Sequence, residues 1–486
     1  MSTLKSAAGQ TFRSLRIRNY KLYFVGQLVS TCGTWMQSVA QSWLVFNITG
    51  SNAAVGVTLA LQFTPILLGG AWSGALSGRR RLITFDVGGT SADIGIVADG
   101  RFVEATARDT WIAGYPLLAP MLDIHTIGAG GGSIAHIDSG GAFRVGPHSA
   151  GADPGPAAYG RGGTQPTVTD ANLVLGRLDP GNFLGGAMRL DPDAARRAIG
   201  GLAQRLGLGL EETAEGVLTI VNANMANAIS SRTVQKGLDP RGFALVAFGG
   251  AGPLHGAEVA RALGIPEIIV PAYPGITSAV GLLTTDLKYD AVRTAFQAGD
   301  AIDLDRLNRD LAAMREELAR QLTADGVAAA DAAFERSGDL RYVGQGYELR
   351  VPFPDMPLDP AVLARIFETF GELHRVEYGH VFAASPIEIV NIRVSGIGYM
   401  PKIMPSYRHA GGSLGEALVK TACCAFRSNG QLTTVMTPFY RRSLLPLGET
   451  IAGPAIVLQT DSTTVVPPDT TLTADDSGNL ILRTEG

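Results

Sequence analysis

The amino-acid sequence predicts an α/β protein with an N-terminal α-helical transmembrane hairpin, the boundary lying close to residue 80. Three observations lead to this prediction. The segment from Leu22 to Gly78 contains no charged residue. Beyond it, short apolar runs rich in β-branched residues end in glycine clusters. Longer segments with apolar residues at helical spacing lie between these runs, and such alternation is typical of α/β proteins.

The composition indicates a globular chain rather than a disordered or fibrous one. Of the 486 residues, 46% are hydrophobic and 17% are charged, which allows two or three domains. A net charge of -4 gives no electrostatic reason to expect nucleic acid as a partner, since proteins that bind it usually carry a basic face. The cysteines Cys32, Cys423 and Cys424 form neither a disulfide framework nor a zinc motif, so a cytoplasmic setting is expected for the α/β part.

The first eighty residues offer two uncharged segments, Leu22 to Phe46 and Ala53 to Leu76. Each is long enough to cross about 30 Å of hydrocarbon as a helix. Basic residues flank the pair on both sides, including Arg79 to Arg81 after it, and the positive-inside rule then places both ends in the cytoplasm. We therefore expect an anchor in the inner membrane. The alternative is a buried helical pair in a soluble core.

The stretch "LITFDVGGTSADIGIV" reads as a strand, a sharp turn and a second strand. Gly88 and Gly89 let backbone N–H groups approach phosphate oxygens, and Thr90 adds a hydroxyl. Asp86 and Asp93 are candidates to hold Mg²⁺ with the nucleotide. The spacing is neither that of a Walker loop nor that of a dinucleotide fold. A tight β-turn with polar residues is the alternative.

Two further glycine clusters follow apolar, strand-like runs. The first is "IGAGGGS", and the second is "FALVAFGGAGPLHG", in which a proline opens a helix. The alternative for the second cluster is close packing of helix on strand. Three glycine loops in one domain predict a nucleotide cleft. The candidate nucleotide-binding residues from these two clusters are Gly130, Gly131, Gly132, Gly249, Gly250, Gly252 and Pro253.

Polar residues near the glycine loops are candidates to line the same cleft. His125, His148 and Arg161 are the ones we select. Metal ligation by histidines is one reading, and hydrogen-bonded loop histidines are the other. No G-x-S-x-G motif marks a nucleophile, so the sequence assigns no catalytic residue. Cys423 and Cys424 lie in an apolar run and are expected in the core.

The remaining elements can be placed by periodicity. Helices are expected over 193–206, 211–235, 301–326 and 360–378, the third as a surface connector. Asparagines at 222, 224 and 227 either line the cleft or form a polar helix contact. Strands dominate the rest of the C-terminal part. We expect three parts: the hairpin at 1–80, a nucleotide-binding core at 81–300 and a C-terminal mixed α/β domain at 301–486.

From about Leu82 onward the chain resembles the hydantoinase/oxoprolinase family, the A-type subunit shared by N-methylhydantoinases, 5-oxoprolinases and acetone carboxylases. The resemblance rests on "ITFDVGGTSADIGIV", "IHTIGAGGGSIAHIDSGGAFRVGPHS", "DPRGFALVAFGGAGPLHG" and "GPAIVLQTDSTTVVPP". It implies an actin-like (RNase H-like) ATPase fold that uses ATP and Mg²⁺. It also implies action on a cyclic amide, such as a hydantoin, 5-oxoproline or a related lactam, with a B-type partner subunit.

The first eighty residues depart from that family. Members carry an earlier lobe with a first Asp-x-Gly-Gly-Thr loop, and residues 1–80 hold no such copy. Instead "YFVGQLVSTCGTWMQSVAQSWLVFNITGS" and "GGAWSGALSGRRR" resemble the start of a major facilitator superfamily transporter. The core is thus expected to lack its first lobe. The alternatives to an active subunit are an inactive fusion with a transporter fragment and a membrane-bound binding scaffold.

Overall fold

The computed structural model describes residues 78–484, apart from 104–110, 113–114, 117–121, 284, 383–384, 402–410 and 429. The chain divides into two compact units, Met1–Leu282 with Ser406–Gly486 and Leu283–Pro405. The first division follows Leu282, whereas the sequence placed a boundary at residue 300. The second was not expected, because residues 406–486 group with the glycine-rich core rather than with 301–405.

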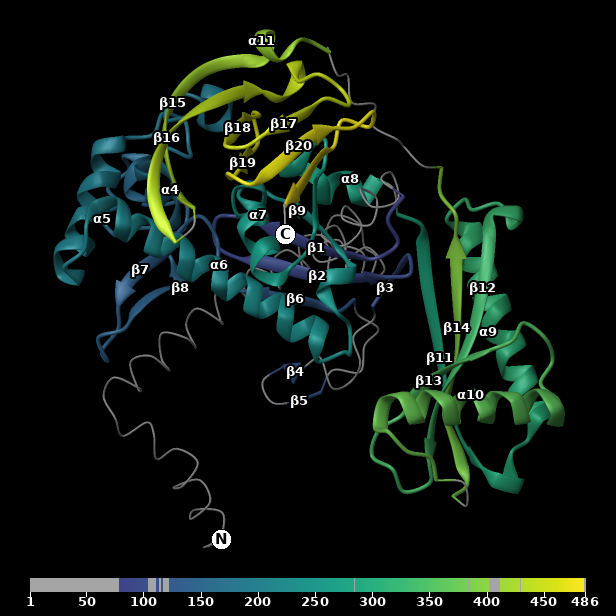
Figure 1. The fold of residues 1–486 in the computed structure, drawn as a ribbon. Helices are drawn as coiled ribbons and strands as arrows, with labels where there is room; N and C mark the ends of the chain where they lie inside the picture. Colours follow the sequence, from purple (N-terminus) through teal and green to yellow (C-terminus); the bar gives the residue numbers. More distant parts are fainter. Residues whose placement is uncertain are drawn as a thin grey trace, which may run out of the picture. The chain divides into compact units, whose positions relative to one another are not determined.

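The centre of the first unit is a nine-stranded sheet (Figure 1). Strand β1 (Leu82–Val87) pairs antiparallel with β2 (Ala92–Ala98) and parallel with β9 (Ala244–Phe248). Beyond these, β6 (Ile124–Ile127) joins β2 and β10 (Glu267–Val270) joins β9. The strand-turn-strand prediction for residues 82–98 is confirmed. The order across this part of the sheet is β6-β2-β1-β9-β10.

Both edges of this sheet are extended by other segments. The last strand of the described chain, β21 (Leu480–Thr484), pairs antiparallel with β10. It is followed in the sheet by β20 (Thr470–Ala474) and β17 (Thr450–Ala452). The short β3 (Arg101–Phe102) lies beside β2 at the other edge. The two halves of the first unit therefore share one continuous sheet.

Four helices complete the core around the sheet, α4 (Val168–Val174), α5 (Pro192–Leu206), α6 (Leu210–Val234) and α7 (Gly252–Leu263). Apolar residues of all four helices join Leu245 and Ala247 of β9 in one hydrophobic cluster. The alternate β9 residues lie in a second cluster on the opposite face of the sheet. Figure 1 shows α4, α5 and α6 beside one another, and they contact each other in pairs.

Local sequence explains where these helices begin. At α4, Thr167 and Asp170 form a capping box, so the helix starts at Val168. Asp191 caps α5 from its side chain, and a proline stands in its first turn. The predicted helices at 193–206 and 211–235 are confirmed to within one residue at each end.

The other elements of the first unit form small sheets and short helices. They are β4 (Trp111–Ile112), β5 (Tyr115–Pro116), β7 (Ser133–Ile137), β8 (Phe143–Ser149), η2 (Ala157–Tyr159), η3 (Phe183–Gly186), η4 (Pro240–Gly242), η5 (Pro274–Ile276), α8 (Thr277–Leu283), α11 (Leu414–Ala417), β15 (Leu418–Ser428), β16 (Gln431–Arg441), η8 (Arg442–Leu444), β18 (Ala455–Leu458) and β19 (Thr463–Val466). Strands β15, β16, β18 and β19 form a four-stranded sheet. Within it Cys424 is buried, as predicted, whereas Cys423 is exposed.

The second unit is a four-stranded antiparallel sheet packed with two helices. Its elements are β11 (Leu287–Ala298), η6 (Gly299–Ala301), α9 (Leu304–Ala324), η7 (Ala329–Asp331), β12 (Ala332–Tyr342), β13 (Leu349–Phe353), α10 (Pro360–Tyr378) and β14 (Ile387–Gly398). The prediction of a surface connector at 301–326 was wrong, because α9 buries Leu307, Leu311 and Met314 in the core of this unit. A stripe of apolar residues at helical spacing is the signal for such packing.

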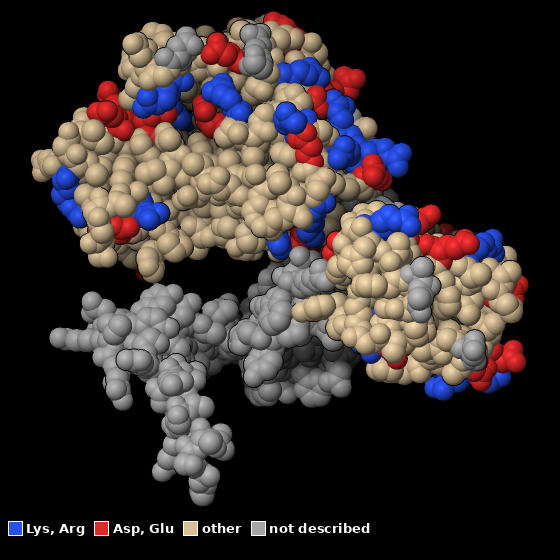
Figure 2. Space-filling view, turned by 60° about the horizontal axis from the view of Figure 1, so that its bottom comes forward, with Lys and Arg blue, Asp and Glu red and all other residues tan. Residues whose placement is uncertain are grey.

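The predicted transmembrane segments, Leu22 to Phe46 and Ala53 to Leu76, lie outside the described residues. Among the helices that the structure does describe, none combines the length and the apolar character needed to cross a bilayer. On the face shown in Figure 2, acidic and basic side chains are interspersed. This mixture fits the small net charge of the chain.

A buried ion pair ties α4's end to α6. The Arg177 guanidinium lies 2.8 Å from the Glu215 carboxylate, and both side chains are at most 9% exposed. Arg177 also donates to the carbonyl oxygen of Ala425 in β15. Burial raises the pKa of Glu215, and Arg177 opposes that shift. Removing one partner of such a pair leaves a buried charge without compensation.

We predict that Arg177→Met lowers the free energy of unfolding by about 3 kcal/mol, because Glu215 would remain buried with only the longer Arg427 contact, at 3.8 Å, to oppose its charge. The double variant with Glu215→Leu is expected to recover most of this loss. Urea unfolding followed by circular dichroism measures both. Arg197→Met is the control, because Arg197 is exposed and its ion pair with Asp191 is long, at 4.0 Å. Equal losses for Arg177→Met and Arg197→Met would contradict the prediction.

Candidate functional site

The three predicted glycine loops meet at the ends of β1 and β9. The amide of Gly131 donates to the carbonyl of Gly88 at 3.0 Å, and that of Gly132 to the carbonyl of Gly89 at 2.6 Å. The amide of Ala251 donates to the carbonyl of Val87 at 2.9 Å. Loops that lie far apart in the sequence are therefore joined backbone to backbone.

Several of these contacts need residues without a Cβ atom. A Cβ on Gly130 would lie 2.7 Å from the Gly88 carbonyl oxygen and 2.8 Å from the Thr90 nitrogen. Gly249 has a φ of 78°, and a Cβ there would collide with the Asp86 carboxylate. A Cβ on Gly252 would press on the Phe85 carbonyl oxygen at 3.1 Å. Gly252, the first residue of α7, fits the alternative given for its cluster, the close packing of helix on strand, whereas Gly130 packs against the β1–β2 turn.

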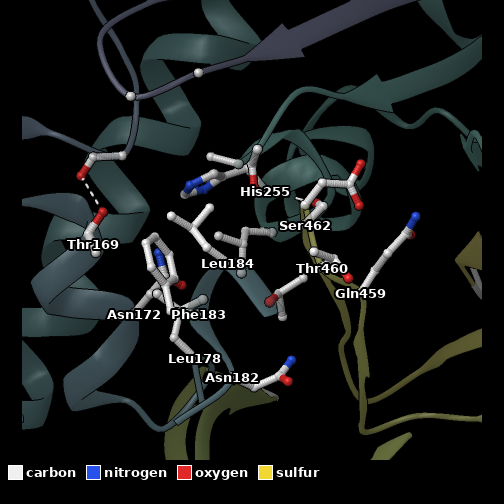
Figure 3. Close-up of a pocket in the computed structure, with 18 of the residues that line it drawn as sticks. Thr169, Asn172, Leu178, Asn182, Phe183, Leu184, His255, Gln459, Thr460 and Ser462 are labelled. Carbon is white, nitrogen blue, oxygen red and sulfur yellow. Dashed lines mark hydrogen bonds between the residues drawn. The ribbon is translucent and has the colours of Figure 1, made fainter. Parts of the chain in front are cut away.

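One cavity of about 130 Å³ opens between the loops (Figure 3). Of the predicted nucleotide-binding residues, Gly88, Gly89, Gly131 and Gly250 line it directly. The other wall comes from α4, η3, the start of α7 and the β18–β19 turn. The remaining lining residues are Tyr159, Thr169, Asn172, Leu178, Asn182, Phe183, Leu184, Ala251, Leu254, His255, Gln459, Thr460, Asp461, Ser462 and Thr463.

Two loop amides at the cavity remain available to a ligand. Within the part of the chain that the structure describes, the N–H groups of Gly89 and Gly250 donate to no protein acceptor. Gly250 also lies two residues before the start of α7, whose N-terminal end carries a partial positive charge. Pro253 lies in the first turn of this helix, as predicted, and needs no acceptor for its nitrogen. Such a loop suits an anionic oxygen.

Asp86 and Asp93 face each other across the β1–β2 pair. They are direct register partners, so their side chains lie on the same face. Ser278 donates to Asp86 at 3.1 Å, and Thr126 donates to Asp93. Burial raises the pKa of Asp86 to about 6, the Ser278 hydrogen bond opposes this rise, and the nearby Asp93 charge adds to it. A cation between the two carboxylates would relieve that repulsion.

His255 and Asn172 are buried side chains with one free polar atom each. Nδ1 of His255 lies 2.8 Å from Oδ1 of Asn222, so Asn222 makes the polar helix contact that was one of its two predicted roles. Nε2 of His255 and Oδ1 of Asn172 have no hydrogen-bond partner among the described residues. Burial, followed by the Arg177 charge, lowers the pKa of His255 to about 4.

The polar residues predicted from their nearness to glycine loops lie elsewhere. His125 belongs to β6 and is half-buried, and its pKa is lowered by burial and by the Arg232 charge. His148 is exposed at the end of β8, and Arg161 is exposed and reaches the Ala152 carbonyl oxygen. None of the three lines the cavity. No group of three or more His, Cys, Asp or Glu residues in the described chain is arranged to hold a metal.

Sequence reasoning missed the α4 and C-terminal walls of the cavity. Thr169 and Asn172 stand in the first and second turns of a helix recognised only by its cap. Residues 459–463 form the β18–β19 turn, where Asp461 accepts a hydrogen bond from the Gly275 amide at 2.8 Å. The available signal was the polar run "QTDST" between two apolar strands, which marks a turn but not its neighbours.

Comparison with known families finds two matching regions. The Hydantoinase/oxoprolinase family matches residues 68–291, which include all three glycine loops. A family described as transmembrane secretion effector matches residues 9–88, the region where the sequence predicted a transporter-like hairpin.

Individual relatives extend the match beyond the first region. Caprolactamase subunit alpha of Pseudomonas jessenii is 35% identical over 405 residues, which cover 82% of this chain and 58% of that protein. The structure of the ATP-dependent caprolactamase from Pseudomonas jessenii gives a TM-score of 0.76 at 33% identity, covering 87% of this chain and 61% of that one. Nucleotide-free acetone carboxylase gives a TM-score of 0.71 at 26% identity, covering 87% and 61%. The chain thus spans about three fifths of the length of these relatives.

We predict that Gly130→Ala lowers the free energy of unfolding by about 2 kcal/mol, because the new methyl group meets only backbone atoms. Hydrogen exchange of the amides at 88–90 should accelerate as the turn is displaced. Gly201→Ala is the control. It lies in α5 with no atom within 4 Å of the added methyl group, and it should stabilise the protein by about 0.5–1 kcal/mol. Unchanged exchange at 88–90 would contradict the predicted displacement.

We predict that Asp86→Asn stabilises the metal-free protein at neutral pH. The folded pKa of about 6 exceeds the ordinary value of 3.8, so the folded state binds the proton more tightly. The resulting stability is fully present below pH 3.8 and is lost as the pH rises through about 6. A pKa shift of about two units changes the free energy of unfolding by roughly 3 kcal/mol at most.

Melting curves in EDTA between pH 4 and pH 8 test this expectation. The Asp86→Asn variant should melt at a higher temperature than the wild type at pH 7.5, and the difference should shrink toward pH 4. Asp99→Asn, in the exposed turn after β2, should run parallel to the wild type. A constant offset across the whole pH range would show that Asp86 does not titrate as described.

Proposed function

Because the chain belongs to the hydantoinase/oxoprolinase family, we propose that it is the ATP-binding subunit of an enzyme that hydrolyses a cyclic amide. The substrate would be a hydantoin, 5-oxoproline or a related lactam. A B-type subunit would be its partner, and the relative named caprolactamase subunit alpha supports a multi-subunit assembly. The family match and the site geometry support this proposal together.

The observation that carries the proposal is the meeting of three glycine loops at one cavity. The amides of Gly89 and Gly250 and the start of α7 would hold phosphate oxygens of ATP. Gly88 and Gly131 line the same wall, whereas Gly130, Gly132, Gly249 and Gly252 let the backbones approach one another. The Thr90 hydroxyl, 3.5 Å from that of Ser149, stands at the edge of the loop.

Asp86 and Asp93 would hold Mg²⁺ bound with the nucleotide. Their opposed carboxylates and the raised pKa of Asp86 fit a divalent cation, since oxygen ligands are what Mg²⁺ prefers. Mg²⁺ would neutralise phosphate charge during phosphoryl transfer. The Ser278 hydroxyl would orient Asp86 through its hydrogen bond.

We further propose that the sheet order β6-β2-β1-β9-β10, with α6 and α7, is an actin-like (RNase H-like) lobe. A cavity of about 130 Å³ is smaller than the roughly 300 Å³ at which small-molecule sites begin. Most of the nucleotide would therefore contact a second lobe or a partner. Residues 22–76 would anchor the protein to the inner membrane, with the main domain in the cytoplasm, and the match at residues 9–88 supports this.

We predict that the full-length protein in detergent binds Mg-ATP and hydrolyses it only with a B-type subunit and a cyclic amide. Asp86→Ala should weaken Mg-ATP binding at least about tenfold, because a cation contact of more than about 1.4 kcal/mol is lost. Calorimetry measures affinity, and phosphate release with hydantoin, 5-oxoproline or caprolactam measures turnover.

Asp99→Ala, in an exposed turn, is the matched control and should bind Mg-ATP like the wild type. Unchanged affinity in Asp86→Ala would remove this loop from the nucleotide site. Mg-ATP binding without turnover in any combination of partner and substrate would favour a non-catalytic scaffold. Absence of both would favour an inactive fusion.

A further inference from the structure

Two residues of the cavity wall each hold a buried polar atom without a protein partner. His255 and Asn172 are each 1% exposed, and both line the cavity wall. Among the described residues, nothing donates a hydrogen bond to Nε2 of His255 or to Oδ1 of Asn172. Each unpaired buried acceptor costs about 1–3 kcal/mol. A ligand that donates hydrogen bonds to them would recover part of that cost.

Each of these two side chains makes one hydrogen bond to the protein, and that bond shows that its remaining polar atom is an acceptor. Oδ1 of Asn222 can only accept, so Nδ1 of His255 carries the proton of the 2.8 Å hydrogen bond and Nε2 keeps its lone pair. Nδ2 of Asn172 donates to the Val168 carbonyl oxygen at 3.1 Å, which leaves the amide oxygen for the cavity. The wall therefore complements N–H or O–H groups.

The acceptor pair is also uncharged. Burial and the Arg177 charge hold the pKa of His255 near 4, so the imidazole is neutral at pH 7. A neutral imidazole and a carboxamide oxygen offer nothing to a carboxylate, which has only acceptor atoms. An anionic group on the ligand would be disfavoured next to them.

The rest of the wall suits a small apolar ring. Leu178, Phe183, Leu184, Leu254 and Tyr159 line the same space (Figure 3). The volume of about 130 Å³ compares with the roughly 150 Å³ of an engineered cavity that holds a benzene ring. A ring of five to seven atoms with one or two N–H groups matches this size and polarity.

We propose that His255 and Asn172 form a subsite that binds the ring N–H of an uncharged cyclic amide. The subsite lies in the cavity that Gly88, Gly89 and Gly250 also line. Because a single ring fills a space of this size, the phosphates would reach these loops from outside the cavity. The inference rests on the proposed function, since that function supplies the substrate class. Hydantoin presents two N–H groups to two acceptors, and caprolactam presents one.

The test compares caprolactam with N-methylcaprolactam, which has the same ring without the N–H group. Binding to the full-length protein is measured by calorimetry, with and without a non-hydrolysable ATP analogue. Caprolactam should bind at least about tenfold more tightly, because the methylated ring leaves the buried acceptors unpaired. 5-Oxoproline, with its carboxylate, should bind more weakly than caprolactam.

Three variants assign that preference to the subsite. Asn172→Leu and His255→Phe keep side-chain volume but remove an acceptor, so each should reduce the ratio of the two affinities by about threefold or more. Asn182→Leu, in the same wall, is the control and should keep the wild-type ratio. Because His255→Phe leaves Asn222 without its partner, melting curves accompany it, and Asn172→Leu stands on its own if that variant is unfolded.

Equal affinity for the two lactams in the wild type would overturn the subsite, and so would an unchanged ratio in Asn172→Leu. Failure of caprolactam, hydantoin and 5-oxoproline to bind in the presence of the ATP analogue would also overturn it. Mg-ATP affinity and partner-dependent turnover are measured separately. These two measurements test the proposed function independently of the result for the subsite.

Discussion

Close approach of backbone to backbone is the constraint on which the site depends. The β1–β2 turn receives amides from the loop at 130–132, and the loop at 249–252 closes on the end of β1. Gly130 and Gly249 stand where any side chain would meet main-chain atoms or the Asp86 carboxylate. Because the three loops touch through main chain alone, the N–H groups that remain are held rigidly. The position of α4 is coupled to this contact, because Thr169 donates to the Gly131 carbonyl oxygen through both its N–H group and its hydroxyl.

The polar groups of the first unit fall into two kinds. Arg442 is buried and donates to three main-chain carbonyls, and Arg177 is matched by Glu215, so these charges bind the elements together. Near the glycine loops the pattern is reversed. Asp86 is ionised at neutral pH at some cost to the fold, and His255 and Asn172 keep unpaired acceptors. Such groups lower the stability of the protein without ligand. A ligand that pairs with them therefore adds more stability than one that binds elsewhere.

The sequence carried the local features of this fold more clearly than the long-range ones. Strands β1 and β9 end in glycines, and the ends of α5, α6 and α10 were predicted to within a residue, because capping and periodicity are local signals. The nearness of His125 and His148 to glycine loops was misleading, since position along a strand does not tell which surface a side chain reaches. The turn at 459–463 joins the cavity only through tertiary contacts with the loops at 250 and 275. No local pattern contains that information.

The division of the first unit by the second one has a consequence for synthesis on the ribosome. Strand β10 and the glycine loops leave the exit tunnel well before β21 and the β18–β19 turn, because the whole unit Leu283–Pro405 is translated between them. During that interval β10 is an unpaired sheet edge, and the cavity lacks one wall. Such an edge is prone to pair with other chains. The nascent protein is therefore expected to depend on chaperones for longer than a chain of the same length with contiguous domains.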